Sequence, residues 1–231
     1  MTLQDIFDQL MYGELSQISV GGAEAGEISK ANYPRIMAHI TLGLTTLYKR
    51  FQLKEGTVVI RVLPGVNKYT LDSNGDTVFV TGPNDEDFDN DVLKIEEVIT
   101  DLGVSLPVND RNNPYSVQTP NHTTLVIPSK WKEDVVPETL TVVYRANHPA
   151  IRNRTNFKPS NVSVELPESY LEALLLFVAS RINNPIGMTN EFHAGNSYAA
   201  KFEQECARLE MVNLQIDQGQ TNSRLHAGGW V

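Results

Sequence analysis

Cysteines, long apolar runs and a secretory signal are what this sequence most obviously lacks. Its 231 residues include one cysteine, Cys206, which excludes an internal disulfide framework and gives no sign of an oxidising compartment. No apolar run approaches the roughly 20 residues that a membrane-spanning helix needs. The opening MTLQDIFDQL lacks the basic segment and apolar core of a secretory signal. Apolar residues still make up 41% of the chain, so we expect a globular protein with a substantial core and no membrane segment.

The familiar catalytic signatures are also missing. The sequence contains no Gly-rich phosphate loop, G-x-S-x-G elbow, H-E-x-x-H pattern or paired C-x-x-C. Cys206 lies on the apolar face of a predicted helix, so we interpret it as a core residue and not as a nucleophile. We predict that the protein is not an enzyme and has no catalytic residue, cofactor or metal; a site assembled from distant residues is the alternative. The histidines, which show no metal-ligand spacing, are His39, His122, His148, His193 and His226.

The first third of the chain has helical periodicity. TLQDIFDQL predicts a helix with Thr2 as its N-cap. After the small-residue linker GGAEAGEIS, Ser29 is a candidate cap for a long helix through KANYPRIMAHITLGLTTLYKRFQL. The regular part of that helix should start near Pro34, because proline is tolerated in a first turn, and Gly56 closes the segment. The predicted apolar stripe of the long helix consists of Ile36, Ile40, Leu44, Leu47 and Phe51.

The middle of the chain changes to a period of two. The runs TVVIRVL, KYTL, TVFV, TTLVIP and ETLTVVYRA are separated by Gly, Pro and Asn turn signals. They predict an antiparallel β region of about six strands. In the last run, Leu140, Val142 and Tyr144 share one face. The run VLKIEEVIT, residues 92–100, fits a helix and a strand about equally well.

The last third returns to helical periodicity. LPESYLEALLLFVASRINNP predicts a helix that begins at Pro167 and is ended by its closing Asn-Asn-Pro. IGMTNEFHAGN is predicted as a loop, and a second helix is predicted from about Ser197 to about Ile216, so that the two helices form an αα-hairpin. The order of elements predicts an α+β fold. Its parts are an N-terminal helical segment at 1–56, a central antiparallel β region at 57–164, a C-terminal helix hairpin packing with the N-terminal helices at 165–216, and an extended C-terminal arm at 217–231.

The stretch GPNDEDFDNDVLKIEEV resembles a calcium-binding loop in its spacing. Aspartates at alternate positions from Asp85 to Asp91 are followed by Glu96 at the twelfth position. An EF-hand also needs flanking helices and a glycine at its sixth position, where Asn90 stands here. The preceding TVFVTGP is β-branched and ends in Gly-Pro, which an entering helix would not tolerate. We therefore predict a solvated acidic loop, and the alternative is a calcium-dependent β-rich binding module that uses residues Asp85–Glu96.

A second charged segment has the opposite sign. Between Thr139 and Val164 there is no acidic residue, although the whole chain carries a formal charge of −9. The overall acidity argues against a broad nucleic-acid-binding surface. Two interpretations stay open: a contact with an acidic neighbouring subunit or with nucleic acid, and a simple balance of surface charge. The basic residues of this segment are Arg145, Arg152, Arg154 and Lys158.

Three stretches together resemble the head-to-tail adaptor family of short-tailed phages, the tail tubular protein A-like or connector proteins. MAHITLGLTTLYKRFQLKEGTVVI resembles the long helix that leads into the sheet of these adaptors, and TLTVVYRANHPAI is similar to their last strand. VELPESYLEALLLFVASRINNP with GNSYAAKFEQECARLE resembles their closing helix hairpin. The resemblance covers most of residues 28–212 and lies in patterns, without a catalytic signature. The acidic loop and the long polar tail depart from the family.

The resemblance implies a structural virion protein at the head–tail junction, assembled in the host cytoplasm. It implies a homo-oligomeric ring of about a dozen copies, whose partners are other copies of itself, the portal protein and a tail nozzle or tube protein. The ring would extend the DNA ejection channel, and DNA would pass through its lumen without specific binding. Family members dock a C-terminal arm on the portal. The expected portal-binding plugs of this arm are Leu225, Trp230 and Val231.

Overall fold

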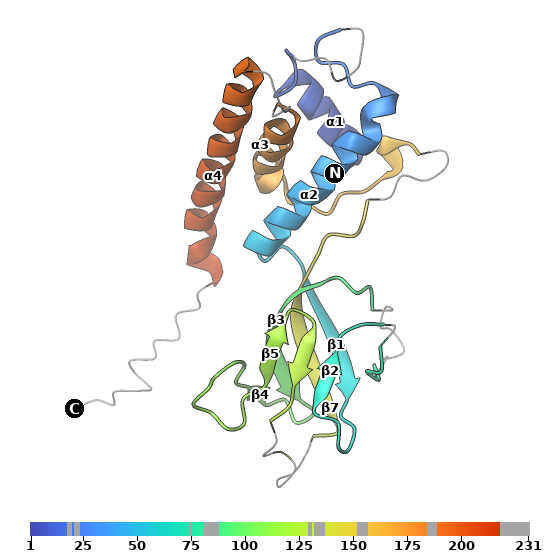
Figure 1. The fold of residues 1–231 in the computed structure, drawn as a ribbon, viewed down its shortest axis with the longest axis vertical. Helices are drawn as coiled ribbons and strands as arrows, with labels where there is room; N and C mark the ends of the chain where they lie inside the picture. The colour runs from blue at the N-terminus through green and yellow to red at the C-terminus, as the bar shows by residue number, and fades with distance from the viewer. Residues whose placement is uncertain are drawn as a thin grey trace, which may run out of the picture. The chain divides into compact units, whose positions relative to one another are not determined.

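The chain folds into a helical unit and a β unit, and the predicted α+β class is confirmed (Figure 1). Unit 1 consists of Met1–Leu44 and Ile151–Val231, and unit 2 consists of Thr45–Ala150. Unit 1 is therefore built from both ends of the chain, with unit 2 inserted between them in the sequence. The computed structural model describes residues 1–17, 20, 24–73, 75–80, 88–128, 131, 137–151, 157–183 and 189–217.

The first helix, α1 (Leu3–Tyr12), begins at the predicted cap. The Thr2 hydroxyl oxygen accepts a hydrogen bond from the Asp5 amide at 3.3 Å, and the Asp5 carboxylate accepts one from the Thr2 amide at 2.7 Å. This reciprocal pair satisfies two amides that a helix start otherwise leaves without partners. The bonds from the Thr2 amide and hydroxyl also hold the pKa of Asp5 below its ordinary value. The buried face of α1 consists of Leu3, Ile6, Phe7 and Leu10.

A segment from the second half of the chain lies directly against the start of α1. The Leu3 amide donates to the Val162 carbonyl, and the Val164 amide donates to the Met1 carbonyl, both at 2.9 Å. An isolated antiparallel bridge joins Thr2 to Ser163 between these two bonds. These backbone contacts fix the preceding 3₁₀ turn, η3 (Pro159–Asn161), beside α1.

The long helix α2 (Tyr33–Arg50) has Pro34 in its first turn, as expected. The prediction of Ser29 as its side-chain cap is wrong. Ser29 precedes a separate 3₁₀ turn, η1 (Lys30–Asn32), and makes no capping hydrogen bond. Its hydroxyl oxygen instead accepts from the Asn32 side-chain amide at 3.0 Å. The predicted apolar stripe is fully confirmed as buried: Ile36, Ile40, Leu44, Leu47 and Phe51.

Two packed helices close unit 1, and Figure 1 shows them side by side. After the short turn η4 (Glu168–Tyr170), α3 (Leu171–Ile182) packs on α4 (Thr189–Asp217) with the Phe177 and Phe202 rings 5.3 Å apart. The helix hairpin is thus confirmed, but the predicted loop is too long, since α4 begins at Thr189 and not near Ser197. A single glycine costs a helix interior only about 1 kcal/mol, so the buried Gly195 does not stop α4.

The described residues of unit 2 form two antiparallel sheets. One has the strand order β1-β7-β3-β4 and the other the order β2-β6-β5. β7 is central in the first sheet, paired with β1 on one side and with β3 on the other. The strands are β1 (Glu55–Arg61), β2 (Lys68–Thr70), β3 (Val92–Thr100), β4 (Ser105–Leu106), β5 (Gln118–Asn121), β6 (Thr124–Val126) and β7 (Thr139–Ala146).

The described part of unit 2 differs from the predicted β region in two ways, and it decides the run that fitted both a helix and a strand. It has seven strands instead of about six. Residues 92–100, which fit both periods, form β3, because pairing with β7 satisfies their backbone groups along nearly the whole run. TVFV forms no strand of its own; Phe79 makes one bridge to Ile60, and the Arg61 amide donates to the Val78 carbonyl at 2.9 Å. The predicted shared face of β7 is confirmed, since Leu140, Val142 and Tyr144 are all buried.

Candidate partner-binding sites

The acidic segment leads into a strand and not into a helix. Asn90 adopts a positive φ of 57°, a conformation that asparagine tolerates better than most residues. Its side chain accepts from the Ser73 amide at 2.7 Å and donates to the Ser73 hydroxyl at 2.6 Å. β3 begins two residues later, at Val92. The exiting helix that an EF-hand requires is therefore replaced by a strand, and Asp85 and Asp87 lie outside the described residues.

Two carboxylates of the calcium-like pattern have partners within the sheet. Asp91 accepts a hydrogen bond from the Tyr144 hydroxyl at 3.1 Å and lies 3.7 Å from the Lys54 ammonium. Glu96 forms ion pairs with Arg145, at 2.9 Å, and with Lys94. Burial, followed by the charge of Asp91, raises the pKa of Tyr144 well above its ordinary value, so this hydroxyl stays a donor. In the described ranges, no group of three His, Cys, Asp or Glu side chains is placed to hold a metal ion.

The two described residues of the predicted basic segment, Arg145 and Lys158, belong to different units. The Arg145 side chain is only 18% exposed; besides pairing with Glu96, it donates to the Lys49 carbonyl at 2.9 Å. Arg145 therefore acts inside unit 2, as a link between β3, β7 and the last turn of α2. Arg152 and Arg154 lie outside the described residues. Lys158 is exposed in unit 1, where it lines a pocket.

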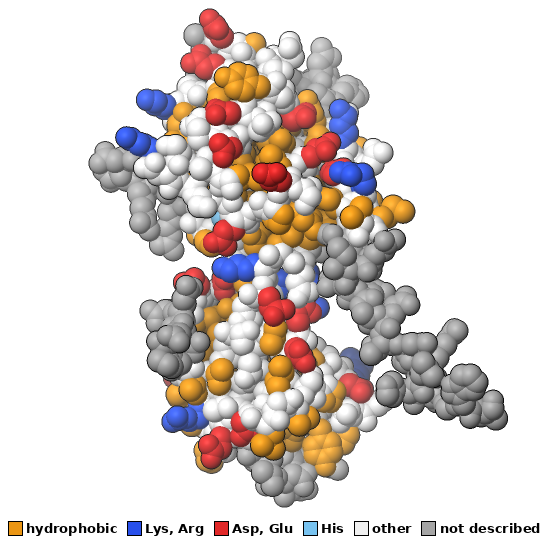
Figure 2. All heavy atoms as spheres, turned by 180° about the vertical axis from the view of Figure 1, so that it is seen from behind, with side chains coloured by type: hydrophobic (Ala, Val, Ile, Leu, Met, Phe, Trp, Pro, Cys, Tyr) orange, Lys and Arg blue, Asp and Glu red, His pale blue; other side chains and the backbone are white. Residues whose placement is uncertain are grey.

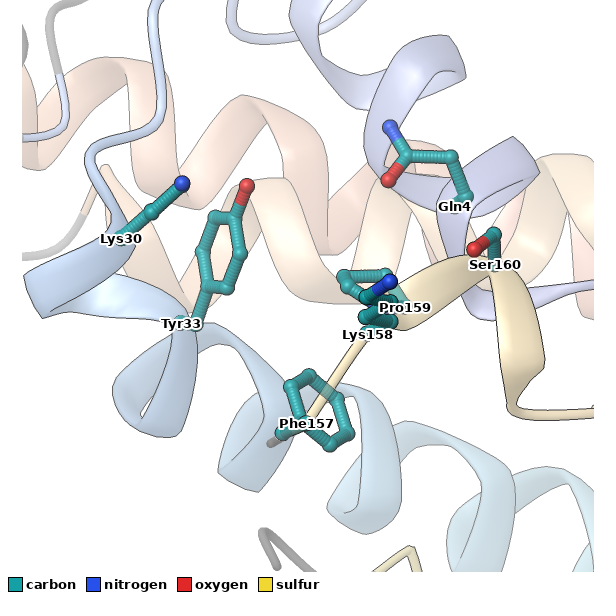
Figure 3. A pocket seen from close by; sticks show the side chains of 7 residues that line it. All are labelled: Gln4, Lys30, Tyr33, Phe157, Lys158, Pro159 and Ser160. Carbon is teal, nitrogen blue, oxygen red and sulfur yellow. The ribbon is translucent and has the colours of Figure 1, made fainter. Parts of the chain in front are cut away.

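That pocket lies in unit 1 and has a volume of about 430 Å³, within the range of ligand-binding pockets. Figure 3 shows the Tyr33 ring on one side and Phe157 with Lys158 on the other, while Gln4 and Ser160 lie at one end. We call it the lysine pocket. Three parts of the chain build it: α1, the η1–α2 junction, and the segment around η3. Its lining consists of Gln4, Lys30, Tyr33, Phe157, Lys158, Pro159 and Ser160.

The lysine pocket is positively charged with apolar walls. Lys30 and Lys158 are both exposed, and neither makes an ion pair with a carboxylate among the described residues. Tyr33 and Phe157 are half-buried, and the Tyr33 ring is held by the Phe7 ring, 4.9 Å away. Two ammonium groups beside two aromatic rings suit an anionic group attached to an apolar or peptide portion.

In the view of Figure 2, acidic and basic side chains are interspersed, and neither unit shows a uniformly charged face. Binding of a charged partner would therefore depend on local clusters such as the lysine pocket. Sequence reasoning singled out Lys158 but missed Gln4, Lys30, Tyr33 and Ser160. In the sequence, the segment around η3 lies more than 120 positions from α1 and from the η1–α2 junction, and no local pattern indicates that these parts meet. The clue available in the sequence was weak: an aromatic and a basic residue stand together twice, in KANY and in NFK.

The other singled-out residues have simpler roles or no described position. Cys206, the one cysteine of the sequence, is buried on α4, as predicted. His39 is half-buried on α2, and burial lowers its pKa, helped by the positive charges of Arg35 and Arg181. The arm residues Leu225, Trp230 and Val231 lie outside the described residues.

His39 gives a testable dependence of stability on pH. Because its pKa is lowered in the folded chain, the unfolded chain binds more protons as the pH falls through the ordinary value of 6.5. Stability should therefore decrease across that interval, and the decrease should be smaller in His39→Gln. Thermal midpoints measured from one pH unit above 6.5 to one below check this. His122→Gln, at an exposed position, is the control, and identical curves for His39→Gln and the unaltered chain would contradict the assignment.

Comparisons with known proteins found no match among protein-family profiles and none among curated proteins. Within the described residues, no helix has both the length and the apolarity needed to cross a membrane.

Proposed function

We propose that this chain is a structural virion protein, a head-to-tail adaptor that forms a ring of about a dozen copies below the portal. The ring would extend the DNA channel and offer the platform on which the tail is attached. The supporting observation is the arrangement of the elements. The three stretches that resemble the adaptor family form α2 running into β1, the central strand β7, and the packed pair α3 and α4.

The chemistry of the described residues is consistent with a role in assembly. Among the described charged side chains of the acidic and basic segments, three are bonded within unit 2, in the pairs Asp91–Tyr144 and Glu96–Arg145. The lysine pocket offers binding groups but no nucleophile paired with a base. At −9 per chain, a dozen copies would carry a charge on the order of −100, and carboxylates lining the lumen would repel DNA phosphates, so that the duplex slides.

Mixing the purified chain with the portal protein of its own phage tests the proposal. Electron micrographs should show rings of the chain stacked on the portal, with a mass that corresponds to about a dozen copies. Deleting residues 218–231 should abolish this binding, because the arm carries Trp230, the residue type most enriched in binding hot spots. Trp230→Ala alone should weaken the binding by about 2 kcal/mol.

The deletion begins after the last residue of α4, so the truncated chain should keep the circular dichroism spectrum and thermal midpoint of the full chain. That measurement is the control for folding. Portal binding by the truncated chain at full strength would reject the role of the arm. Absence of any complex between the full chain and the portal would reject the adaptor function itself.

A further inference from the structure

The lysine pocket of unit 1 presents one ammonium group and one aromatic ring on each of two sides. Lys30 and Tyr33 come from the η1–α2 junction, and Phe157 and Lys158 come from the segment that leads into η3 (Figure 3). Neither ammonium group has a carboxylate partner among the described residues. The pocket is thus a local positive site in a chain whose formal charge is −9.

Both sides of the pocket are held in place by contacts outside it. The Tyr33 ring packs on the buried Phe7 ring, with the ring centres 4.9 Å apart. The turn η1 is fixed by Asn32, whose side-chain amide donates to the Val20 carbonyl at 3.0 Å. On the other side, η3 is fixed beside α1 by backbone hydrogen bonds. A site that is already formed loses less conformational entropy when its ligand binds.

The cations of the pocket favour phosphate over carboxylate as the bound anion. The described lining contains two lysines and no arginine. A guanidinium fork matches a carboxylate through two parallel hydrogen bonds, whereas an ammonium group is a compact point charge and a common ligand of phosphate. Each ammonium of Lys30 and Lys158 is carried on a flexible four-carbon stem and can adjust to the position of a phosphate.

The rest of the lining suits a nucleobase. Tyr33 and Phe157 are half-buried rings, and the flat face of any base stacks on an aromatic side chain. The pocket volume of about 430 Å³ lies within the range of small-ligand sites. Of the anions that carry an apolar portion, a nucleoside phosphate therefore matches both the charge of the pocket and its rings.

Two hydrogen-bond acceptors lie at one end of the pocket. The Gln4 side-chain amide nitrogen donates to Asp8 at 2.7 Å, which leaves the Gln4 carbonyl oxygen as an acceptor. The Ser160 hydroxyl donates to the Asn161 side-chain oxygen at 3.3 Å, which leaves the Ser160 oxygen as a second acceptor. Adenine and cytosine carry an amino group that donates to such acceptors, and thymine carries none.

We propose that the lysine pocket binds a nucleoside phosphate, with its phosphate paired to Lys30 and Lys158 and its base against the Tyr33 and Phe157 rings. Gln4 and Ser160 accept from the amino group of the base. The ligand is a free nucleotide or one nucleotide of a single strand, because both present the same phosphate and the same base face. The inference goes beyond the proposed adaptor function and does not rest on it.

Titration calorimetry of the full chain at low salt tests which parts of the ligand are recognised. Deoxyadenosine monophosphate should bind at least about tenfold more tightly than inorganic phosphate, which lacks the base, and than deoxyadenosine, which lacks the phosphate. Deoxythymidine monophosphate should bind about fivefold more weakly, because it leaves the two acceptors without an amino group. Added salt should weaken the binding of the nucleotide.

A short single strand of deoxyadenylate and its duplex form distinguish the two sources of the ligand. Tighter binding of the single strand than of the mononucleotide, with weak binding of the duplex, assigns the pocket to single-stranded nucleic acid. Binding of the single strand no tighter than the mononucleotide assigns the pocket to a free nucleotide. Either result supports the proposal.

Variants of the lining separate the roles of charge and stacking. The double variant Lys30→Ala with Lys158→Ala should lower the affinity for deoxyadenosine monophosphate about tenfold or more and leave that for deoxyadenosine unchanged. Tyr33→Leu should lower both affinities about tenfold, whereas Tyr33→Phe keeps the ring and should retain them. The matched control is Lys201→Ala, whose ammonium lies 5.3 Å from the centre of the Tyr198 ring outside the pocket, and it should bind like the unaltered chain.

Circular dichroism checks that each variant is folded. Lys30 and Lys158 are exposed, so their double variant should fold even if Tyr33→Leu does not. The proposal is overturned if deoxyadenosine monophosphate does not bind, if inorganic phosphate binds equally tightly, or if the double lysine variant binds like the unaltered chain. A hexaglutamate peptide that binds more tightly than every nucleotide would also overturn it, since the pocket would then be a site for an acidic peptide.

Discussion

Replacing Gly56 by valine should lower the free energy of unfolding by about 2–4 kcal/mol, because the position has no room for a side chain. Gly56 lies directly opposite Tyr144 across the β1–β7 pair. A Cβ atom on Gly56 would lie 2.4 Å from Cζ and 2.6 Å from the hydroxyl oxygen of Tyr144. The ring would have to move, and it would lose its hydrogen bond to Asp91 and its edge contact with Phe88.

Urea unfolding followed by tryptophan fluorescence measures this effect in unit 2. The chain has two tryptophans, and Trp131 is buried in the core of unit 2, so a Trp230→Phe background leaves one reporter in the right place. Thr57→Val, at the exposed neighbouring position of β1, is the matched control and should change stability by less than about 0.5 kcal/mol. In a Tyr144→Ala background the valine at position 56 should cost far less. An equal cost in both backgrounds would show that the ring is not the obstacle.

The second large effect is expected at Arg145. Arg145→Ala should destabilise unit 2 by about 2–3 kcal/mol, since it removes an ion pair and a helix-end hydrogen bond together. The Arg145 guanidinium lies 2.9 Å from a Glu96 oxygen and donates to the Lys49 carbonyl at 2.9 Å. That carbonyl is in the last turn of α2, where helix carbonyls lack partners in the next turn. Removing the side chain leaves two acceptors poorly satisfied.

The expected loss is below the 3–5 kcal/mol typical of fully buried pairs, because Arg145 and Glu96 keep 18% and 23% of their side chains exposed and Lys94 still pairs with Glu96. The Trp131 reporter again measures it. Arg145→Lys should restore only part of the stability, since an ammonium cannot bridge both acceptors as the guanidinium fork does. Arg61→Ala, at an exposed site on β1, is the control for losing an arginine from this sheet. A loss at Arg145 no larger than at Arg61 would contradict the assigned role.

Helix periodicity explains why much of α1 and α2 could be predicted. The stripe from Ile36 to Phe51 is buried as its spacing requires, and Thr2 starts α1 because its hydroxyl satisfies an amide three residues away. These interactions join residues that are neighbours in the sequence. Ser29 shows the limit of the same reasoning. Its hydroxyl oxygen could accept a hydrogen bond either from a helix amide or from the nearby Asn32 side chain, and in the structure it accepts from Asn32.

Local sequence therefore determined the α+β class, the buried faces of α1 and α2, the alternation along β7 and the packed pair of C-terminal helices. Tertiary structure decided which of two periods residues 92–100 adopt, because the β7 backbone supplies their hydrogen-bond partners. It also decided that Arg145 serves the sheet and that Lys30 and Lys158 line one pocket. Local preferences depend on residues a few positions apart in the sequence. The partners of a charged side chain and the lining of a pocket depend on which residues the fold brings together, and some of these are more than a hundred positions apart.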